Sequence, residues 1–388
     1  MTASFDRVVR NFDKRYADYF GGNRGAAFAV RSPDGAQHTF GNGQPSFTLA
    51  AADSRGVDAL ATLDQLVIAE SYLHGHLDVE GEVAAVLSHR NFFPDVHPLQ
   101  TAWNFLKPRL TGQVRSDAQW ISHHYDIEAG FFLLFLDKRH RCYSHGIFES
   151  DEVSLEDAIT RKMEFALTSI EAKPGDRVLD VGGGWGAFTE YAGCKDVRVT
   201  SLTISRESER FLNELIARER LPCTARYEHL YKHTPEQLYD SIVVLGVTEH
   251  LPDYDKSLAK YRSLLKPGGK VYLDASAKRQ KYDVSAFLRR HIYPGNGSPM
   301  CLHDYLRAVA ASPFRLEGVW DDRHSYALTA YHWAKRLDAN KDEAQRRWGI
   351  AQYRKFRLFL WGCADGFARD DLQAYRVVLG LPNSLTTN

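Results

Sequence analysis

The stretch Arg177-Val178-Leu179-Asp180-Val181-Gly182-Gly183-Gly184-Trp185-Gly186 decides the fold of this chain. Its first five residues form a short apolar run with two valines, which predicts a buried β-strand. The glycines that follow suit a chain that turns sharply from a strand into a helix. They also let the backbone approach a ligand closely at the carboxyl edge of a sheet. The sequence therefore predicts a ligand-binding turn there, with a helix from about Trp185.

The same alternation of strands and helices continues toward the C-terminus. The expected elements are strands at 197–202, 241–245 and 270–273, and helices at 206–220 and 254–265. Lys266-Pro267-Gly268-Gly269 should end the second of these helices, because proline and glycine do not continue one. Alternating elements of this kind predict an α/β fold with a parallel sheet covered by helices on both faces.

The N-terminal part of the chain has a different sequence pattern. At 388 residues the chain fits one large and one small domain. Residues up to about 110 hold short apolar clusters broken by turns, with a helical-looking stretch at 57–73. Leu106–Gly112, with its proline and glycine, suits a linker. We therefore predict a small N-terminal domain over 1–112 and a catalytic domain over 113–388.

Composition excludes several classes of function. The formal net charge is zero, so the chain has no overall positive charge that would attract nucleic acid as a partner. No apolar run approaches the roughly 18–20 residues that cross a bilayer, and the first residues lack the layout of a signal peptide. The five cysteines are scattered without a CxxC pair, which argues against a disulfide framework and against a zinc site. We expect a cytoplasmic protein without a bound metal.

The glycine-rich turn has the pattern D-x-G-x-G-x-G and lacks a phosphate-gripping Lys-Ser/Thr, so it suits S-adenosylmethionine better than a nucleoside triphosphate. By itself it could equally be a structural turn or a dinucleotide site. Three further features change the balance: Lys173-Pro174-Gly175-Asp176 before the strand, Lys266-Pro267-Gly268-Gly269 before a later one, and Thr248-Glu249-His250 after the strand at 241–245. Their combination is typical of class I methyltransferases.

Several separated blocks resemble the cyclopropane-fatty-acid and mycolic-acid cyclopropane synthases. The blocks that carry the resemblance over nearly the whole chain are 69–81, 124–126, 131–137, 143–149, 178–186, 202–205, 249–251, 292–295, 353–356, 362–367 and 371–375. This family implies a class I, Rossmann-like methyltransferase core with a seven-stranded, mostly parallel sheet. Its last strand, at about 372–379, would be antiparallel. The resemblance also implies a small, mainly helical N-terminal domain.

The resemblance implies methyl transfer from S-adenosylmethionine to the double bond of an unsaturated fatty acyl chain, esterified in a phospholipid. In the family a bound bicarbonate removes the proton that lets the cyclopropane ring close. Of the residues that hold this anion, Glu249 and Tyr326 carry over. Two others do not: the family's Y-S-C is Tyr143-Ser144-His145 here, and its L-L-H is Tyr272-Leu273-Asp274.

These departures bear on the base and on the product. His145 could hydrogen-bond an anion if protonated, whereas Asp274 beside Glu249 should repel bicarbonate unless one of the two carboxylates is protonated. Either the anion binds, or it is absent and a side chain is the base, for which a His–Asp pair is one arrangement. Loss of the proton elsewhere would give a methyl- or methylene-branched chain instead of a cyclopropane. We interpret Cys142 as an unrelated buried thiol.

The residues that we predict to bind the cofactor come from four blocks and are Tyr143, Ser144, Asp180, Gly182, Gly184, Trp185, Gly186, Thr203, Ser205 and Glu228. Two positions depart from the family: Ser208 replaces a usual glutamine, and Tyr227-Glu228-His229 replaces a usual Q-D pair near the adenine. We therefore expect a remodelled adenosyl pocket.

Some of the residues singled out above could instead have a purely structural role. Glu249 could be a carboxylate favoured at a helix start, and Tyr326 an ordinary residue of an amphipathic helix. The run 353–361 suits a core helix, a wall of an acyl tunnel or a surface for phospholipid headgroups. A small-molecule N- or C-methyltransferase and a non-catalytic homologue also stay open. By resemblance we expect a homodimer in peripheral contact with the inner membrane face.

Overall fold

The computed structural model describes residues 3–21, 25–97, 128–293 and 297–383. They divide into two compact units. The first comprises 1–101, 285–292 and 337–365, and the second comprises 102–284, 293–336 and 366–388. The predicted linker at 106–112 and the block 124–126 lie outside the described residues, so the predicted boundary at 112 stays a prediction.

The second unit is built on a seven-stranded sheet with the strand order β10-β11-β9-β8-β5-β6-β7. Its strands are β5 (Arg177–Val181), β6 (Arg198–Thr203), β7 (Thr224–Tyr227), β8 (Tyr239–Leu245), β9 (Leu265–Ala277), β10 (Arg315–Asp321) and β11 (Gln373–Gly380). The pairs from β7 through β6, β5 and β8 to β9 are parallel, while β11 runs antiparallel to both β9 and β10. The predicted mostly parallel sheet with an antiparallel last strand is confirmed.

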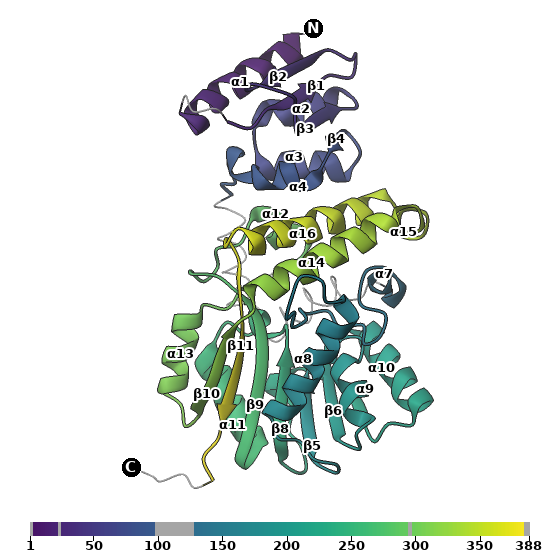
Figure 1. Cartoon of the computed structure of the whole chain (residues 1–388), viewed down its shortest axis with the longest axis vertical. Coiled ribbons are helices and arrows are strands. Elements are labelled where there is room, and N and C mark those ends of the chain that lie inside the picture. Colours follow the sequence, from purple (N-terminus) through teal and green to yellow (C-terminus); the bar gives the residue numbers. More distant parts are fainter. Residues whose placement is uncertain (1–2, 22–24, 98–127, 294–296, 384–388) are drawn as a thin grey trace. The chain divides into compact units, whose positions relative to one another are not determined.

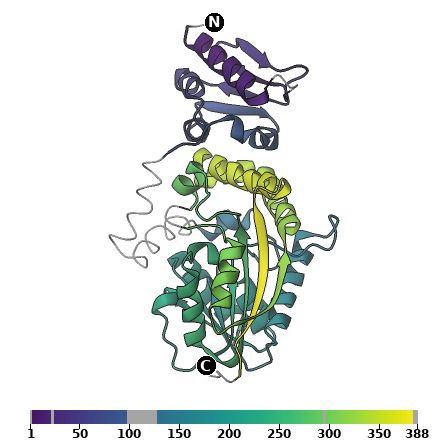
Figure 2. The same ribbon diagram turned by 90° about the vertical axis from the view of Figure 1, so that its left-hand side faces the viewer.

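Helices cover both faces of this sheet, as its apolar strands require. On one face lie α8 (Leu155–Ser169), α9 (Ala187–Gly193) and α10 (Arg206–Glu219), and on the other lie α11 (Tyr254–Leu264) and α13 (Leu302–Ala310) (Figures 1 and 2). Short elements of the same unit are α7 (Ala129–Leu133), η2 (Leu230–Lys232) and η3 (Thr248–His250), and α14 (Arg323–Ala339) begins in it.

Helices make up most of the first unit. They are α1 (Ala3–Phe20), α2 (Ser54–Thr62), α3 (Gln65–Leu73), α4 (Val83–Ser88), η1 (Arg90–Phe92), α12 (Ala286–His291), α15 (Lys341–Trp348) and the greater part of α16 (Ile350–Ala368). The sequence did not predict its four-stranded sheet, whose order is β2-β1-β3-β4. These strands are β1 (Phe28–Arg31), β2 (Gln37–Phe40), β3 (Phe47–Ala51) and β4 (Leu77–Gly81). Phenylalanine rings such as Phe12, Phe28 and Phe47 fill the core of the first unit.

Two predicted elements differ from the structure. The helix expected at 57–73 is two helices, because Leu63 adopts a left-handed conformation (φ 57°) and Asp64 caps α3 by accepting from the N–H of Val67. The helix expected at 254–265 is confirmed, because α11 ends at Leu264, before Lys266-Pro267-Gly268-Gly269. The next strand starts at Leu265 and not at Lys270 as expected, so this segment lies inside β9. Among the described residues, no helix has the length and apolar character to cross a bilayer.

The predicted helix at 353–361 belongs to α16, and its basic residues have structural roles in the first unit. Arg354 is buried and donates to the carbonyl oxygens of Tyr72 (2.7 Å) and Leu77 (2.9 Å). Arg357 donates to Asp338 (2.9 Å), as does the indole of Trp361 (2.9 Å). These bonds support the core-helix reading of this run.

Candidate functional site

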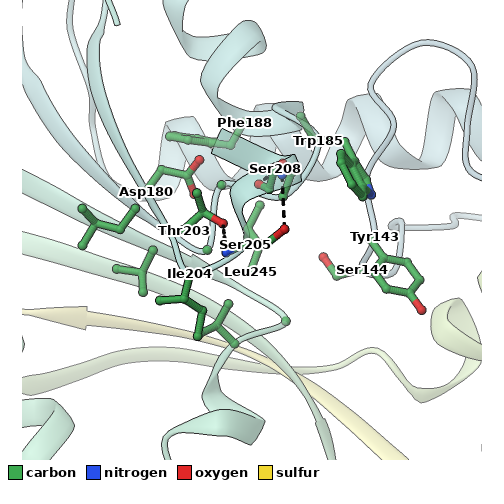
Figure 3. Close-up of a pocket in the computed structure, with 18 of the residues that line it drawn as sticks. Tyr143, Ser144, Asp180, Trp185, Phe188, Thr203, Ile204, Ser205, Ser208 and Leu245 are labelled. Carbon is green, nitrogen blue, oxygen red and sulfur yellow. Dashed lines mark hydrogen bonds between the residues drawn. The ribbon is translucent and has the colours of Figure 1, made fainter. Parts of the chain in front are cut away.

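A cavity opens at the carboxyl ends of β5, β6 and β8, where the chain leaves each strand for the next helix or turn. The glycine-rich turn at 182–184 and Trp185 form one part of its lining, and the apolar walls include Leu202, Ile204 and Leu245. Tyr143 and Ser144 lie across the cavity from Asp180 and Thr203 (Figure 3). Ligands of open α/β sheets bind at this edge, so the cavity is the expected place for a cofactor.

The turn requires glycine for steric reasons. Gly182 has a φ of +84°, and a Cβ atom there would lie 2.3 Å from Cγ2 of Val247. The hydroxyl of Ser208 donates a 2.6 Å hydrogen bond to the carbonyl oxygen of Gly184 and so fixes the turn from the start of α10. Ser208, which departs from the family pattern, thus has a structural role in holding the cofactor turn.

Asp180 is a buried carboxylate one residue before the end of β5. Its Oδ2 accepts from the hydroxyls of Thr189 (3.0 Å) and Ser201 (3.2 Å). Burial raises the pKa of Asp180 to about 6, although these two hydrogen bonds act in the opposite direction. The carboxyl group therefore ties β5 to β6 and α9 underneath the cavity.

All the residues predicted to bind the cofactor line this cavity except Gly186. Gly186 has a φ of +82°, and a Cβ there would lie 2.4 Å from Cδ2 of Leu215, so it allows α10 to pack closely on the turn. Glu228 lies after β7 and accepts from Nδ1 of His233 (2.7 Å). Carboxylate, hydroxyl and aromatic groups around apolar walls fit a nucleoside with a charged end, which is the chemistry of S-adenosylmethionine.

The four predicted catalytic residues do not line the cavity. They belong to a buried polar cluster of the second unit, and Lys162, which sequence reasoning missed, connects this cluster to the cavity. Its Nζ lies 2.8 Å from Oδ2 of Asp274, and it donates to the hydroxyl of Ser144, which lines the cavity. Both side chains of the ion pair are fully buried. Burial lowers the pKa of Lys162, but Asp274 outweighs this effect and keeps the pKa above its ordinary value.

This ion pair corrects an expectation about Asp274. We expected its carboxylate to add negative charge beside Glu249 and to repel an anion. In the structure Lys162 neutralises Asp274, whose Oδ1 also accepts from the N–H of Gly246 (2.9 Å).

Cys142 is buried, as interpreted from the sequence, with its Sγ 3.5 Å from Nζ of Lys162. It also lines the cavity.

Glu249 lies in η3, next to the cavity-lining His250. Its Oε1 accepts from both the N–H (2.7 Å) and the hydroxyl (2.8 Å) of Ser276, whereas its buried Oε2 has no hydrogen-bond partner among the described residues. Burial raises the pKa of Glu249 to about 7, although the hydrogen bonds lower it. Glu249 can therefore exchange a proton near neutral pH.

The raised pKa of Glu249 predicts a pH dependence of stability. Because the folded protein holds this proton more tightly than the unfolded chain, the stabilisation is complete below about pH 4.5 and is lost as the pH rises to about 7. Between about pH 5 and about pH 8, the free energy of unfolding should fall by about 3 kcal/mol more in the parent than in Glu249→Gln. Denaturant titrations of both proteins measure this difference. Equal pH dependence of the two would contradict the assignment.

His145 and Tyr326 form the other part of the cluster. Nε2 of His145 lies 2.8 Å from Oδ2 of Asp322, and Nε of Arg376 lies 2.6 Å from the same oxygen. The imidazole ring contacts the ring of Tyr326 with centroids 4.8 Å apart, and Tyr326 stacks on Phe367 at 4.2 Å. Arg376 and Asp274 are register partners on β11 and β9, so the two parts of the cluster lie on neighbouring strands. Glu249 and Tyr326 are half-buried, whereas the other five side chains of the cluster are buried.

A separate group of metal-ligand types lies at the start of α13. Ligand atoms of Cys301, His303 and Asp304 fall within 4.8 Å of one another. Both ring nitrogens of His303 are 3.4 Å from Sγ of Cys301, so the ring does not direct one nitrogen toward a shared centre. Asp304 is also paired with Arg307 (3.0 Å). We assign no metal to this group.

Comparison with known proteins identifies the family. The model of the mycolic acid cyclopropane synthetase family matches residues 113–377, and a domain of unknown function, DUF7884, matches residues 15–91. The probable fatty acid methyltransferase Rv3720 of Mycobacterium tuberculosis is 26% identical over 88% of each chain. The sphingolipid C9-methyltransferase of Candida albicans is 23% identical over 81% of this chain and 67% of its own.

Solved structures agree with the family and the fold. Mycolic acid cyclopropane synthase CmaA1, complexed with SAH and CTAB, is 26% identical with a TM-score of 0.63, over 68% of this chain and 98% of its own. Coclaurine N-methyltransferase, bound to N-methylheliamine and SAH, has the same TM-score at 18% identity, over 83% of this chain and 99% of its own, and shows the fold alone. The chain belongs to the mycolic acid cyclopropane synthetase family and is an S-adenosylmethionine-dependent methyltransferase.

Proposed function

We propose that the enzyme methylates a carbon–carbon double bond in an unsaturated fatty acyl chain esterified in a phospholipid. The observation that carries this proposal is the buried polar cluster beside the cofactor cavity. Methylation of an alkene leaves a cation that must lose a proton, so the enzyme needs a proton acceptor near the transferred methyl group. Glu249 and His145 provide two such groups next to residues that line the cavity.

Similarity supports a lipid acceptor. The relative that matches over 88% of both chains is described as a probable fatty acid methyltransferase, and another relative acts on sphingolipids. CmaA1 was solved with CTAB, a surfactant with a long alkyl chain. The likeness to coclaurine N-methyltransferase does not favour an amine acceptor, because it reflects the fold alone. Peripheral membrane contact, a homodimer and a cytoplasmic location stay predictions.

The chain's residues have defined parts in this reaction. Bound S-adenosylmethionine supplies an electrophilic methyl group. The glycine-rich turn and Ser208 hold its place in the cavity, and apolar walls such as Leu245 exclude water from it. The electron pair of the alkene forms the new carbon–carbon bond as the carbon–sulfur bond breaks. A proton then leaves to a base, which gives either a cyclopropane or a methylene-branched chain.

An assay on vesicles tests the acceptor. Purified protein and S-adenosylmethionine are incubated with phospholipid vesicles that carry monounsaturated chains, and the acyl chains are analysed by mass spectrometry. We expect a gain of one methylene unit in the unsaturated chains. Vesicles with fully saturated chains are the matched control and should show no gain. Methylation of a small amine without any gain in lipid mass would refute the proposal.

A further inference from the structure

The two positions where the chain departs from the family's anion site each have a buried partner, a lysine for Asp274 and a carboxylate for His145. Asp274 pairs with Lys162 at 2.8 Å, and His145 pairs with Asp322 at 2.8 Å. Arg376, on the antiparallel strand β11, contacts Asp322 at 2.6 Å. All five side chains are at most 8% exposed. At both positions, the residue that differs from the family therefore forms a pair with another side chain inside the protein.

Among the described residues of this cluster, the pairing leaves no lysine or arginine for a bound anion. Its fixed charges are Lys162 and Arg376 against Asp274 and Asp322, and each cation already contacts a carboxylate. A buried anion needs an opposite charge and hydrogen-bond donors to offset its desolvation. Within the described part of the chain, carboxylates occupy both cations of this cluster, which favours a group of the protein as the proton acceptor.

The geometry fixes how His145 carries its proton. Burial alone raises the pKa of Asp322, but His145 and Arg376 outweigh it and keep the pKa below its ordinary value, so the carboxylate is ionised. An ionised carboxylate only accepts, so Nε2 of His145 carries the hydrogen that it donates to Asp322. In the neutral ring Nδ1 is then a bare lone pair. Among the described residues it has no hydrogen-bond partner, although it is buried.

His145 follows directly on two residues that line the cofactor cavity, Tyr143 and Ser144. Figure 3 shows both on the side of the cavity opposite Asp180. The ring of His145 packs on Tyr326, which stacks on Phe367. The imidazole is therefore held on one edge by Asp322 and on its face by Tyr326, and its acceptor nitrogen makes no hydrogen bond to the described residues.

We propose that His145 is the proton acceptor of the methyl transfer, and that Asp322 and Arg376 are positioning residues that replace the family's external anion. The inference rests on the proposed function. Nδ1 of His145 takes the proton from the cation formed by methyl transfer. The electron pair of that carbon–hydrogen bond closes the ring; alternatively, a 1,2-hydride shift first moves the cation to the methylated carbon, and the electron pair then forms the double bond of a methylene branch. Asp322 stabilises the resulting imidazolium, and Arg376 keeps Asp322 ionised.

A pair of aspartate variants tests the positioning role. Asp322→Asn keeps the shape but removes the charge that orients His145, and should lower kcat by about 100-fold or more while KM changes less than about threefold. The adjacent Asp321, which is exposed and accepts from the N–H of Arg323, is the matched control. Asp321→Asn should stay within about twofold of the parent. Equal activity of the two variants would overturn the inference.

The pH profile of kcat separates this role from a structural one. Besides Asp322, the charged and titratable groups of the cluster are Arg376 on β11, Tyr272 and Asp274 on β9, Lys162 on α8, Tyr326 on α14 and Glu249 in η3. The acid limb of the profile should change in Asp322→Asn, which removes the carboxylate partner of the imidazole, and should stay unchanged in Glu249→Gln. An acid limb that disappears in Glu249→Gln and is unmoved in Asp322→Asn would assign the base to Glu249 instead.

Two measurements on the parent protein complete the test. Nitrogen-15 NMR of labelled histidines, with His145→Gln to identify the signal, should show hydrogen on Nε2 and a bare Nδ1. The opposite tautomer would overturn the inference even if the parent methylates lipid. Removal of dissolved carbon dioxide should change kcat less than about twofold. A tenfold loss restored by added bicarbonate would also overturn it. Absence of methylated lipid from the parent would refute the proposed function, whatever the tautomer.

Discussion

Replacing Lys162 with methionine is expected to lower the free energy of unfolding by about 3–5 kcal/mol. Methionine fills a similar volume but leaves Asp274 as a charge without its counter-ion, in a site where both side chains are fully buried. Removing one partner of a buried ion pair is far more costly than removing the pair, because the remaining charge stays desolvated. Denaturant unfolding followed by fluorescence measures the change.

Two controls show that burial is the cause of this loss. Arg7→Met breaks an ion pair with Asp58 in which both side chains are more than half exposed, and should cost at most about 1 kcal/mol. The double variant Lys162→Met with Asp274→Leu removes both buried charges and should recover much of the lost stability. If Lys162→Met were as stable as the parent, this would contradict the existence of the buried ion pair.

Gly182→Ala should weaken the binding of S-adenosylmethionine by at least about tenfold, or about 1.4 kcal/mol. The new Cβ atom would lie 2.3 Å from Val247, at a φ of +84°, so the turn and Val247 must shift where both line the cavity. Isothermal titration calorimetry with S-adenosylmethionine, and with S-adenosylhomocysteine as a stable analogue, measures the loss.

Gly175→Ala is the matched control for this substitution. Gly175 has a similar φ of +89°, but nothing lies within 4 Å of the position of its Cβ, and it does not line the cavity. Backbone strain should lower the stability of both variants by about 1–2 kcal/mol, whereas cofactor affinity should fall in Gly182→Ala alone. Equal affinities would contradict the placement of the cofactor at this turn.

The sequence predicts the catalytic fold well, because hydrophobic periodicity and turn residues are local signals. The glycine-rich turn gave the position of the cavity, and β5 has the predicted bounds Arg177–Val181. The errors arise where tertiary structure overrides a local signal. Helix α11 ends before Pro267 as predicted, but the strand expected from Lys270 already starts at Leu265. A left-handed Leu63 divides the helix expected at 57–73.

The partners of the predicted catalytic residues were harder to find. Lys162 occupies the apolar face of α8, four residues after Ala158 and four before Ala166, so helical periodicity could have revealed it as buried. Arg376 interrupts an apolar strand, which is also a signal. No such signal marks Asp322, because Asp321-Asp322 before a helix looks like an ordinary helix start. Its contact with His145 joins residues 177 positions apart and becomes visible only in three dimensions.

The most direct test of the account uses S-adenosylmethionine with a deuterated methyl group on vesicles of monounsaturated phospholipid. The account predicts that label enters the acyl chain at the former double bond, and that the product lacks one deuterium of the methyl group, because a base removes it to form a cyclopropane or a methylene branch. An unlabelled lipid in the presence of protein that binds the cofactor would contradict the central claim that this enzyme methylates an acyl double bond.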